Sequence, residues 1–258
     1  MENLFDLTGK VAVVTGASSG LGADAALAYA KAGADVALLA RRVEKLEKVK
    51  AEIEKTGRKA IAQACDVTKE DSVKTAIHNV LENFGHIDIL LNNAGVAVGG
   101  GVDTMTVEDW DKSFDTNVKG IFLVSKYVVP QMKERNYGKI VNIASINAVI
   151  ADKLDVFIRH SYNSSKAAVV GLTKGMAASY ARYGITVNAV GPALFESEMT
   201  SGTLFKSEEF LKGYNAANPA GRPGKRGELN GTVVYLSSDA SSYVQGQFIT
   251  VDGGSAIV

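Results

Sequence analysis

Short apolar, β-branched runs alternate along the chain with longer segments in which apolar residues recur at helical spacing. Such runs are typical of buried strands, and the segments between them are typical of amphipathic helices. The predicted strands are Val11–Thr15, Val36–Ala40, Ala60–Cys65, Ile87–Asn92, Lys139–Ala144, Ile185–Val190 and Phe248–Val251. The predicted helices are Ala23–Ala32, Glu44–Lys55, Lys69–Phe84, Asp109–Lys133 and Ser165–Tyr183.

The repeated order of strand and then helix predicts an α/β fold. Right-handed crossovers of this kind give a parallel sheet with helices on both faces, and the near-continuous apolar strands fit burial on both faces. We therefore expect a Rossmann-type doubly wound parallel sheet of about seven strands. Ligands bind such sheets at the carboxyl ends of the strands.

Composition narrows the class of protein further. Apolar residues make up 46% of the 258 residues and charged residues 22%, which is typical of a globular protein. The 28 Lys and Arg balance the 28 Asp and Glu, so no net charge favours nucleic acid or an acidic membrane. One cysteine and three scattered histidines predict no metal site. Without a signal-type N-terminus or a long apolar run, we expect a cytoplasmic protein and no membrane partner.

A glycine-rich turn, Thr15–Gly22, follows the first predicted strand and opens a helix. Glycine permits a tight turn and close backbone approach, and a helix N-terminus offers free N–H groups to a pyrophosphate. Glycine is often simply a turn residue, but this position directly after the first strand favours nucleotide binding. The expected phosphate contacts are Gly16, Ser18, Ser19, Gly20, Leu21 and Gly22.

The end of the second predicted strand bears on the choice of nucleotide. An NAD-binding fold usually places Asp or Glu near this point, whereas Arg accommodates the 2′-phosphate of NADP. Here Ala40 takes the acidic position and is followed by Arg41 and Arg42. We therefore expect NADP(H) to be preferred over NAD(H), mainly because of Arg41. The alternative is that the two arginines only begin a solvated helix.

Six motifs occur in an order that makes the chain recognisable. They are the Thr15–Gly22 loop, Asp66-Val67, Asn92-Asn93-Ala94-Gly95, Asn117, Ser145 and Tyr162-x-x-x-Lys166. In this respect nearly the whole chain resembles the short-chain dehydrogenase/reductase family, in its short single-domain branch. Its layout is most similar to the gluconate 5-dehydrogenase and 3-oxoacyl reductase members.

The resemblance implies catalytic roles for four residues. Ser145 would hydrogen-bond the substrate oxygen, Tyr162 would be the general acid and base, and Asn117 would anchor a water that relays the proton. Lys166 would hold the nicotinamide ribose and tune Tyr162. The spacing agrees, because Tyr162 and Lys166 lie four apart on one helix face, where an ammonium lowers the pKa of a phenol from about 10. A surface Tyr–Lys contact on a helix is the alternative.

The resemblance also implies further contacts with the cofactor. Asp66 and Val67 would meet the adenine, although Asp66 could equally cap the following helix. Backbone groups of Asn93, Ala94 and Gly95 would line the cofactor, and Pro192 would flank the nicotinamide.

Two features depart from the family pattern. The segment between Ser145 and Tyr162 is longer than usual and carries Arg159 and His160, either of which could meet an anionic group of the substrate. A salt bridge to Asp152 or Asp155 is the alternative for Arg159. After the sixth strand, Gly191-Pro192-Ala193 replaces the usual Pro-Gly, and the residue that contacts the carboxamide is left open among Phe195, Ser197 and Thr200.

The sequence therefore predicts one dinucleotide-binding catalytic domain, residues 1–258, with a substrate loop or lid at about 193–217. We expect an NADP(H)-dependent oxidoreductase that interconverts a ketone and a secondary alcohol, with a keto sugar acid such as 5-ketogluconate or another small carbonyl as substrate. A hydroxysteroid dehydrogenase and a 3-oxoacyl-acyl-carrier-protein reductase are alternatives, the latter needing a basic patch such as Lys133, Arg135 and Arg182. A catalytically silent dinucleotide-binding module is the non-enzyme alternative. The resemblance implies a homotetramer.

Overall fold

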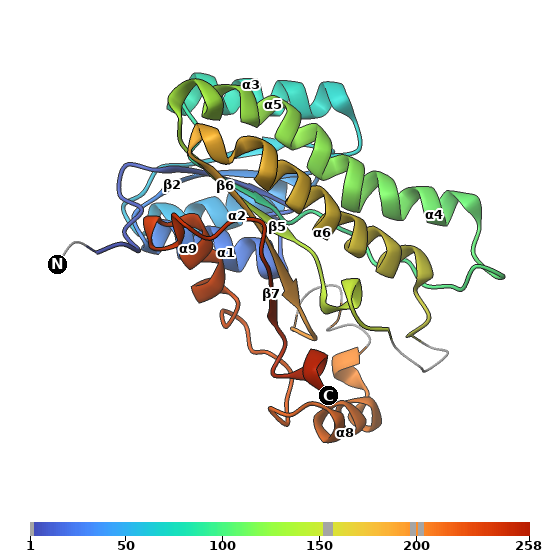
Figure 1. The fold of residues 1–258 in the computed structure, drawn as a ribbon. Coiled ribbons are helices and arrows are strands. Elements are labelled where there is room, and N and C mark those ends of the chain that lie inside the picture. The colour runs from blue at the N-terminus through green and yellow to red at the C-terminus, as the bar shows by residue number, and fades with distance from the viewer. Residues whose placement is uncertain (1–2, 152–156, 197–199, 201–203) are drawn as a thin grey trace.

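A computed structural model of the protein describes residues 3–151, 157–196, 200 and 204–258. Its centre is a seven-stranded sheet in the order β3-β2-β1-β4-β5-β6-β7, and every neighbouring pair is parallel (Figure 1). The strands are β1 (Val11–Thr15), β2 (Asp35–Ala40), β3 (Ala60–Ala64), β4 (Ile89–Asn92), β5 (Gly138–Ile143), β6 (Ile185–Pro192) and β7 (Phe248–Val251). The doubly wound parallel sheet expected from the sequence is confirmed.

Helices cover both faces of this sheet (Figure 1). Helices α1 (Gly20–Lys31), α2 (Val43–Glu54) and α9 (Asn230–Ser237) pack on one face. Helices α3 (Glu70–Phe84), α5 (Gly120–Arg135) and α6 (His160–Tyr180) pack on the other, and α4 (Val107–Phe114) precedes α5. Helix α8 (Glu208–Ala217) lies beyond the sheet, beside the C-terminus.

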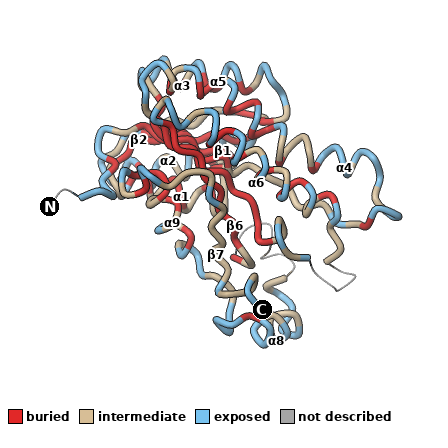
Figure 2. The backbone as a smooth tube through the Cα atoms, in the orientation of Figure 1, coloured by how far each residue is buried: buried red, intermediate tan, exposed pale blue. Residues whose placement is uncertain are grey.

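The core explains why the strands are apolar along their whole length. In β1, Ala12 and Val14 join the apolar cluster under α1 and α2, whereas Val13 joins the cluster under α3 and α5. Successive side chains of a strand point to opposite faces, so both faces need apolar residues when both are covered. The five inner strands of the sheet accordingly form the buried centre of the molecule, whereas the edge strands β3 and β7 are mostly half-buried (Figure 2).

Two of the differences from the predicted helices bear on the site. The predicted helix Asp109–Lys133 is divided by a π-helical segment, η1 (Asp115–Lys119), between α4 and α5. Helix α6 begins at His160 rather than Ser165, because the backbone at His160 donates a hydrogen bond of 3.1 Å to the carbonyl of Gly100. Both differences concern residues expected to be catalytic. Asn117 lies in η1, and Tyr162 lies in the first turn of α6.

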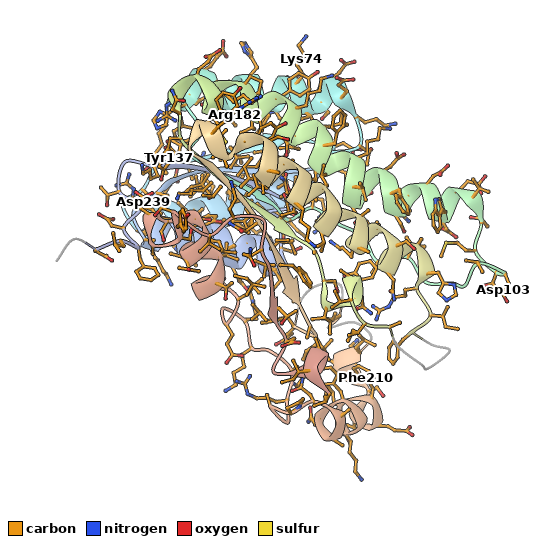
Figure 3. The ribbon with its side chains drawn as sticks, in the orientation of Figure 1. Lys74, Asp103, Tyr137, Arg182, Phe210 and Asp239 are labelled. Carbon is orange, nitrogen blue, oxygen red and sulfur yellow. The ribbon has the colours of Figure 1, made fainter. Side chains whose placement is uncertain are left out.

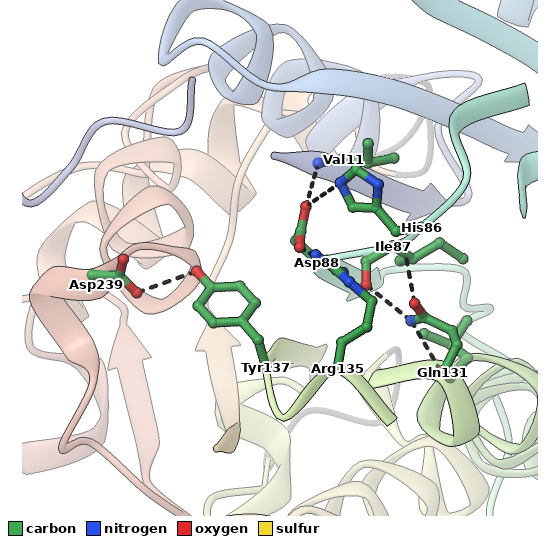
Figure 4. A network of polar contacts seen from close by, with 9 residues as sticks. Val11, His86, Ile87, Asp88, Gln131, Arg135, Tyr137 and Asp239 are labelled. Carbon is green, nitrogen blue, oxygen red and sulfur yellow. Dashed lines mark hydrogen bonds and ion pairs between the residues drawn. The ribbon is translucent and has the colours of Figure 1, made fainter. Parts of the chain in front are cut away.

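At the amino ends of the strands a polar network joins β1, β4 and α5. The buried carboxylate of Asp88 accepts a hydrogen bond of 2.9 Å from the Val11 N–H and one of 2.8 Å from the Arg135 guanidinium (Figure 4). His86 Nε2 lies 3.0 Å from the same carboxylate. Buried charge is tolerated when it is paired and hydrogen-bonded in this way. The amino ends of these strands are therefore closed by structural contacts. A cavity opens at the opposite, carboxyl ends of the strands.

None of the helices in the described part of the chain is long and apolar enough to cross a membrane.

Candidate active site

A cavity of about 920 Å³ lies at the carboxyl ends of the central strands. It runs from Arg41, after β2, past Ser145, after β5, to Phe210 and Tyr214 on α8. This is the position at which doubly wound sheets bind ligands, and the volume lies within the usual range of ligand sites. Within the described residues, no group of three or more His, Cys, Asp or Glu side chains could hold a metal ion.

The glycine-rich turn between β1 and α1 forms one end of this cavity. Gly16 has φ +65°, and an added Cβ there would lie 2.9 Å from the Ala94 Cα. Asn93 fixes the turn from β4, because its Nδ2 donates hydrogen bonds of 3.0 Å and 3.2 Å to the carbonyls of Thr15 and Gly16. Ser19 occupies the N-cap of α1 without a capping hydrogen bond from its side chain. The first N–H groups of α1 are thus left for an anion.

Two arginines stand next to this turn. The Arg42 guanidinium donates hydrogen bonds of 3.1 Å to Ser18 Oγ and 3.2 Å to Ser19 Oγ. Arg41 lines the same end of the cavity, and its charge contributes to holding the pKa of Asp66 below its ordinary value. Two guanidinium groups and two hydroxyls therefore gather where the second strand ends, a donor set that fits a phosphate.

Asp66 lies in the turn between β3 and α3. Its Oδ1 accepts a hydrogen bond of 3.0 Å from the Thr68 N–H and one of 2.8 Å from the Thr68 hydroxyl, which shapes the turn into α3. Asp66 and Val67 also line the cavity. Burial opposes ionisation of Asp66, but the hydrogen bonds from Thr68 outweigh it and lower the pKa of the carboxyl. The group is thus a charged acceptor at neutral pH.

Ser145, Tyr162 and Lys166 line the middle of the cavity. Ser145 follows β5, and Tyr162 and Lys166 lie one turn apart on α6, with the Lys166 ammonium 5.7 Å from the centre of the Tyr162 ring. Lys166 is buried and donates a hydrogen bond of 2.8 Å to the carbonyl of Ile143, the last residue of β5. The strand and the helix are thereby joined at the point where the three side chains meet.

The environment sets the protonation of these groups. Burial lowers the pKa of Lys166 to about 8, because a dry site disfavours the ammonium. Burial raises the pKa of the Tyr162 phenol, while the hydrogen bond with Ser145 and the charge of Arg159 act in the opposite direction. The phenol is therefore protonated at neutral pH and available as a proton donor. The tuning of Tyr162 by Lys166 stays a prediction.

Asn117 lies behind the cavity wall. Its Oδ1 accepts a hydrogen bond of 2.8 Å from the Val96 N–H, and its Nδ2 donates to the Val96 carbonyl at 3.0 Å and to Ser165 Oγ at 2.9 Å. Isolated π-helical turns such as η1 are frequent at functional sites. The described contacts of this side chain are with the protein itself, so it connects the segment after β4 to α6.

A family model described as short chain dehydrogenase matches residues 10–206 of the chain. This span includes the glycine-rich turn and the Ser145, Tyr162 and Lys166 cluster. The chain belongs to the short-chain dehydrogenase family. It is therefore an NAD(P)-dependent enzyme that acts on alcohol and carbonyl groups.

Relatives in the short-chain dehydrogenase family match over almost their full length. The chain is 40% identical over 255 residues to a gluconate 5-dehydrogenase of Gluconobacter oxydans (strain 621H), covering 99% of this chain and 98% of the relative. It is 37% identical to a 3-oxoacyl-acyl-carrier-protein reductase of Thermotoga maritima, with 97% and 99% covered. A crystal structure of gluconate 5-dehydrogenase from Burkholderia cenocepacia J2315, in complex with NADP and tartrate, superposes with a TM-score of 0.93 at 35% identity, with 99% and 98% covered.

Arg159 and His160, the two residues suggested for an anionic group of the substrate, lie in different surroundings. His160 is exposed, and its Nδ1 accepts a hydrogen bond of 3.1 Å from the Val102 N–H, so we drop it from the substrate site. Arg159 lines the cavity beside Tyr162. Its suggested partners Asp152 and Asp155 lie outside the described residues.

The sequence analysis missed the supporting roles of Ser165 and Thr15 and left one contact open. Ser165 and Thr15 bear no recognisable chemistry, yet Ser165 supports Asn117, and Thr15 Oγ1 accepts hydrogen bonds of 2.9 Å and 3.1 Å from the Asn93 and Ala94 N–H groups. Thr200, left open as a carboxamide contact, lines the cavity and donates a hydrogen bond of 2.7 Å to the Phe195 carbonyl. Ser197 lies outside the described residues. The available sequence signals were a hydroxyl next to a glycine for Thr15 and a hydroxyl three positions after Tyr162 for Ser165.

Proposed function

We propose that this short-chain dehydrogenase prefers NADP(H) and interconverts a ketone and a secondary alcohol with Tyr162 as general acid and base. The observation that carries the proposal is the meeting of Ser145, Tyr162 and Lys166 in one cavity whose other end offers a phosphate site. When bound, the nicotinamide dinucleotide supplies the hydride. The protein then has to position the carbonyl, polarise it and exchange a proton.

The roles of the catalytic residues follow from their surroundings. Ser145 Oγ hydrogen-bonds the substrate oxygen, and the protonated phenol of Tyr162 donates its proton to that oxygen as it becomes an alkoxide. In the reverse direction the phenolate accepts the proton of the alcohol. Lys166, held at the Ile143 carbonyl, binds the nicotinamide ribose, and Asn117 anchors the water that returns the proton from solvent.

The cofactor contacts expected from the sequence fit the lining of the cavity. Gly16, Ser18, Ser19, Gly20 and Leu21 hold the pyrophosphate beside the N-terminus of α1, and Gly22 lets the turn pack against Asn93. Asp66 and Val67 meet the adenine. Asn93, Ala94 and Gly95, together with Pro192, line the rest of the cofactor site.

The preference for NADP(H) rests on charge at the ribose end. Arg42 is held by Ser18 and Ser19, and Arg41 lines the wall next to it. A 2′-phosphate would gain charge-assisted hydrogen bonds from this set, whereas a free ribose hydroxyl would find no acceptor at Ala40. Although Arg41 was the main sequence argument, the hydrogen bonds of Arg42 to Ser18 and Ser19 make it an equal candidate.

A keto sugar acid such as 5-ketogluconate is the substrate class that we favour, with another small carbonyl compound as the wider possibility. The support is the 40% identity to a gluconate 5-dehydrogenase over 255 residues. The short 3₁₀ helix η5 (Leu204–Lys206) and α8 act as a lid, and the ring of Phe210 on α8 packs against that of Phe157 in the cavity wall, with the ring centres 5.1 Å apart. The lid excludes water from the carbonyl.

A 3-oxoacyl-acyl-carrier-protein reductase is the second candidate, because such a relative is 37% identical. The basic patch suggested for the carrier does not favour it. Arg182 lies at the far end of the molecule from Phe210 of the lid (Figure 3), Arg135 pairs with Asp88, and Lys133 stacks on Tyr180 and Tyr183. A hydroxysteroid dehydrogenase remains the third candidate.

Oxidation of NADPH against a panel of ketones tests the proposal. The panel contains 5-ketogluconate, a keto bile acid, an acetoacetyl thioester and a small aryl ketone, each measured with wild-type protein and with Tyr162→Phe. Turnover of 5-ketogluconate that is lost in the variant is the expected result. Turnover of another member would select another substrate class. Tight NADPH binding without any turnover would support a catalytically silent module instead.

The homotetramer implied by the family resemblance is part of the proposal. Exposed aromatic residues support a contact surface on the α4 and α5 side, where Trp110 and Phe122 are 38% and 52% exposed. Ile257 and Val258 are exposed at the C-terminus. Light scattering should give four times the mass of the 27.2 kDa chain, and a monomer mass would contradict the tetramer. The cytoplasmic location stays a prediction.

A further inference from the structure

Helix α8 lies at the substrate end of the cavity without burying any residue of its own. All of its residues, Glu208–Ala217, are described, and none of them is buried. Phe210 and Tyr214 line the cavity from this helix. Most helices are held in a protein by an apolar face that packs on the core. The position of α8 therefore has to depend on contacts of another kind.

A buried polar residue, Asn218, ends this helix. It is the C-cap of α8, it is only 5% exposed, and its N–H donates a hydrogen bond of 2.8 Å to the Tyr214 carbonyl. Its Nδ2 donates hydrogen bonds of 2.9 Å to the Asp252 carbonyl and 2.6 Å to Ser255 Oγ. Its Oδ1 accepts one of 2.8 Å from the Ala220 N–H. One buried side chain thus ties the end of α8 to two residues that follow the last strand.

The segment after β7 is folded so that it accepts both hydrogen bonds. The Asp252 carboxylate closes a turn, because it accepts hydrogen bonds of 3.0 Å from the Gly254 N–H and 2.9 Å from the Ala256 N–H. Gly253 has φ +63°, and an added Cβ there would lie 2.8 Å from Asn218 Oδ1. The turn therefore lies directly against Asn218, and the C-terminus lies beside α8 (Figure 1).

Tyr214 connects this anchor to the rings of the cavity wall. Its hydroxyl accepts a hydrogen bond of 3.2 Å from Asn218 Nδ2. Its ring centre is 6.1 Å from that of Phe210, which is 5.1 Å from that of Phe157. A second cavity, of about 210 Å³, lies between Tyr214 and Asp252, so packing does not fill the space behind the helix. A shift of the end of α8 would therefore displace the rings at the substrate end.

We propose that Asn218 is a positioning residue of the substrate site, which holds α8 over the cavity by fastening it to the C-terminal segment 252–258. The inference rests on the proposed function and specifies what keeps its lid in place. Because α8 buries no residue, the hydrogen bonds to Asp252 and Ser255 account for much of its docking. A lid released from them opens more often, so the ketone binds more weakly, while NADPH at the other end of the cavity is unaffected.

Two pairs of matched variants test this role. Asn218→Ala removes the anchor, and Asn188→Ala is its control, because Asn188 is a buried asparagine on β6 whose amide donates to a backbone carbonyl at 2.8 Å. Ser255→Ala removes one hydrogen bond of the anchor, and its control is Ser241→Ala, a buried serine whose hydroxyl donates to a backbone carbonyl at 3.1 Å. Both controls lie outside the described lining of the two cavities.

The steady-state constants for NADPH oxidation are measured with the best ketone of the panel. We expect Asn218→Ala to raise KM for the ketone by about 10-fold and Ser255→Ala by about threefold, because two hydrogen bonds or one are lost. The kcat and the affinity for NADPH should each stay within about threefold of wild type. Both controls should keep the KM of wild type. An unchanged KM in Asn218→Ala, or an equal rise in Asn188→Ala, would overturn the proposal.

Hydrogen exchange keeps the inference separate from the proposed function, since it needs no turnover. The backbone amides of α8 should exchange about 10-fold faster in Asn218→Ala than in wild type or Asn188→Ala, because opening of the helix no longer breaks the two hydrogen bonds. Faster exchange confined to α8 and the C-terminal segment supports the inference, even if no ketone of the panel is reduced and the proposed reaction fails. Equal exchange of α8 in the three proteins would overturn it, even if a ketone is reduced.

Discussion

Asn117 Nδ2 donates a hydrogen bond of 2.9 Å to the hydroxyl of Ser165, which donates one of 2.8 Å to the carbonyl of Tyr162. Asn117 lies in the π-helical segment between α4 and α5, and Ser165 lies in the first turns of α6. The chain of hydrogen bonds thus runs from one helix to the backbone of the residue proposed to donate the proton. We therefore expect Ser165 to be a positioning residue that acts through Asn117 and Tyr162.

Ser165→Ala should lower kcat by about 10- to 100-fold, because a small displacement of a reacting group is costly. It should also lower the free energy of unfolding by about 1–2 kcal/mol, since Asn117 loses a buried partner. Ser161→Ala is the matched control on the same helix, where the Ser161 hydroxyl lies 2.8 Å from that of Ser113. Steady-state kinetics and urea unfolding should show a similar loss of stability in both variants. A similar kcat in both would contradict the positioning role.

The Arg42 site predicts a change in cofactor preference. Arg42→Ala should weaken NADPH binding by about 10- to 100-fold, because a charge-assisted contact with the 2′-phosphate is lost. NADH affinity should change by less than about threefold, since it carries no such group. Arg41→Ala should act in the same direction. Fluorescence titration measures both cofactors, with Lys48→Ala, an exposed cation on α2, as the control. An equal loss for NADPH and NADH would refute the assignment.

Burial of Lys166 predicts an alkaline limit to activity. Its pKa is lowered to about 8, so the ammonium is lost as the pH rises through that value. The kcat/KM for ketone reduction, which reports groups of the free enzyme, should therefore fall above a pH of about 8. A pH profile of kcat/KM that stays level to pH ~10, near the ordinary pKa of lysine, would be incompatible with this prediction.

The same pKa shift predicts the sign of a stability change. Between about 8 and the ordinary value of 10.5, the unfolded chain holds the Lys166 proton more tightly than the folded chain. The contribution of this group to the free energy of unfolding therefore rises with pH across that window. Urea unfolding at both ends of the window, with Lys166→Met as the reference, checks the sign. A free energy of unfolding of wild type minus that of Lys166→Met that falls toward alkaline pH would contradict it.

Gly22 should tolerate no side chain. A Cβ at this position would collide with Asn93 Nδ2 and with the carbonyl of Gly16, which together fix the phosphate-binding turn. Gly22→Ala should lower the free energy of unfolding by about 1–3 kcal/mol and weaken NADPH binding. Gly231→Ala on α9 is the control, because its Cβ would meet no atom within 4 Å, and helix propensity favours alanine there by about 0.5–1 kcal/mol. Equal melting temperatures for the two variants would count against the packing argument.

Most of the fold and the centre of the site could be predicted from the sequence, because both depend on local patterns. β1 was predicted to the residue, since Val11–Thr15 is a continuous apolar run, and the glycine-rich turn follows it directly. The pairing of Tyr162 and Lys166 came from the family resemblance, with which their helical spacing agrees, although the helix begins earlier than predicted.

What the sequence could not supply depends on contacts between distant segments. Ser165 supports Asn117 across 48 positions, and the start of α6 depends on Gly100, far away in the chain. Neither of these two contacts produces a periodic pattern in the sequence. Arg159 and His160 looked equivalent as neighbours in sequence, and only the fold turns one toward the cavity and the other toward Val102.

A single-turnover measurement tests whether Tyr162 donates the proton to the substrate. NADPH-loaded wild-type protein and Tyr162→Phe are mixed with the best ketone of the panel, and the loss of NADPH absorbance is followed in time. We expect unchanged NADPH affinity and a hydride-transfer rate about 10²- to 10⁴-fold lower in the variant. A rate in Tyr162→Phe within about threefold of wild type would contradict general acid catalysis by this residue.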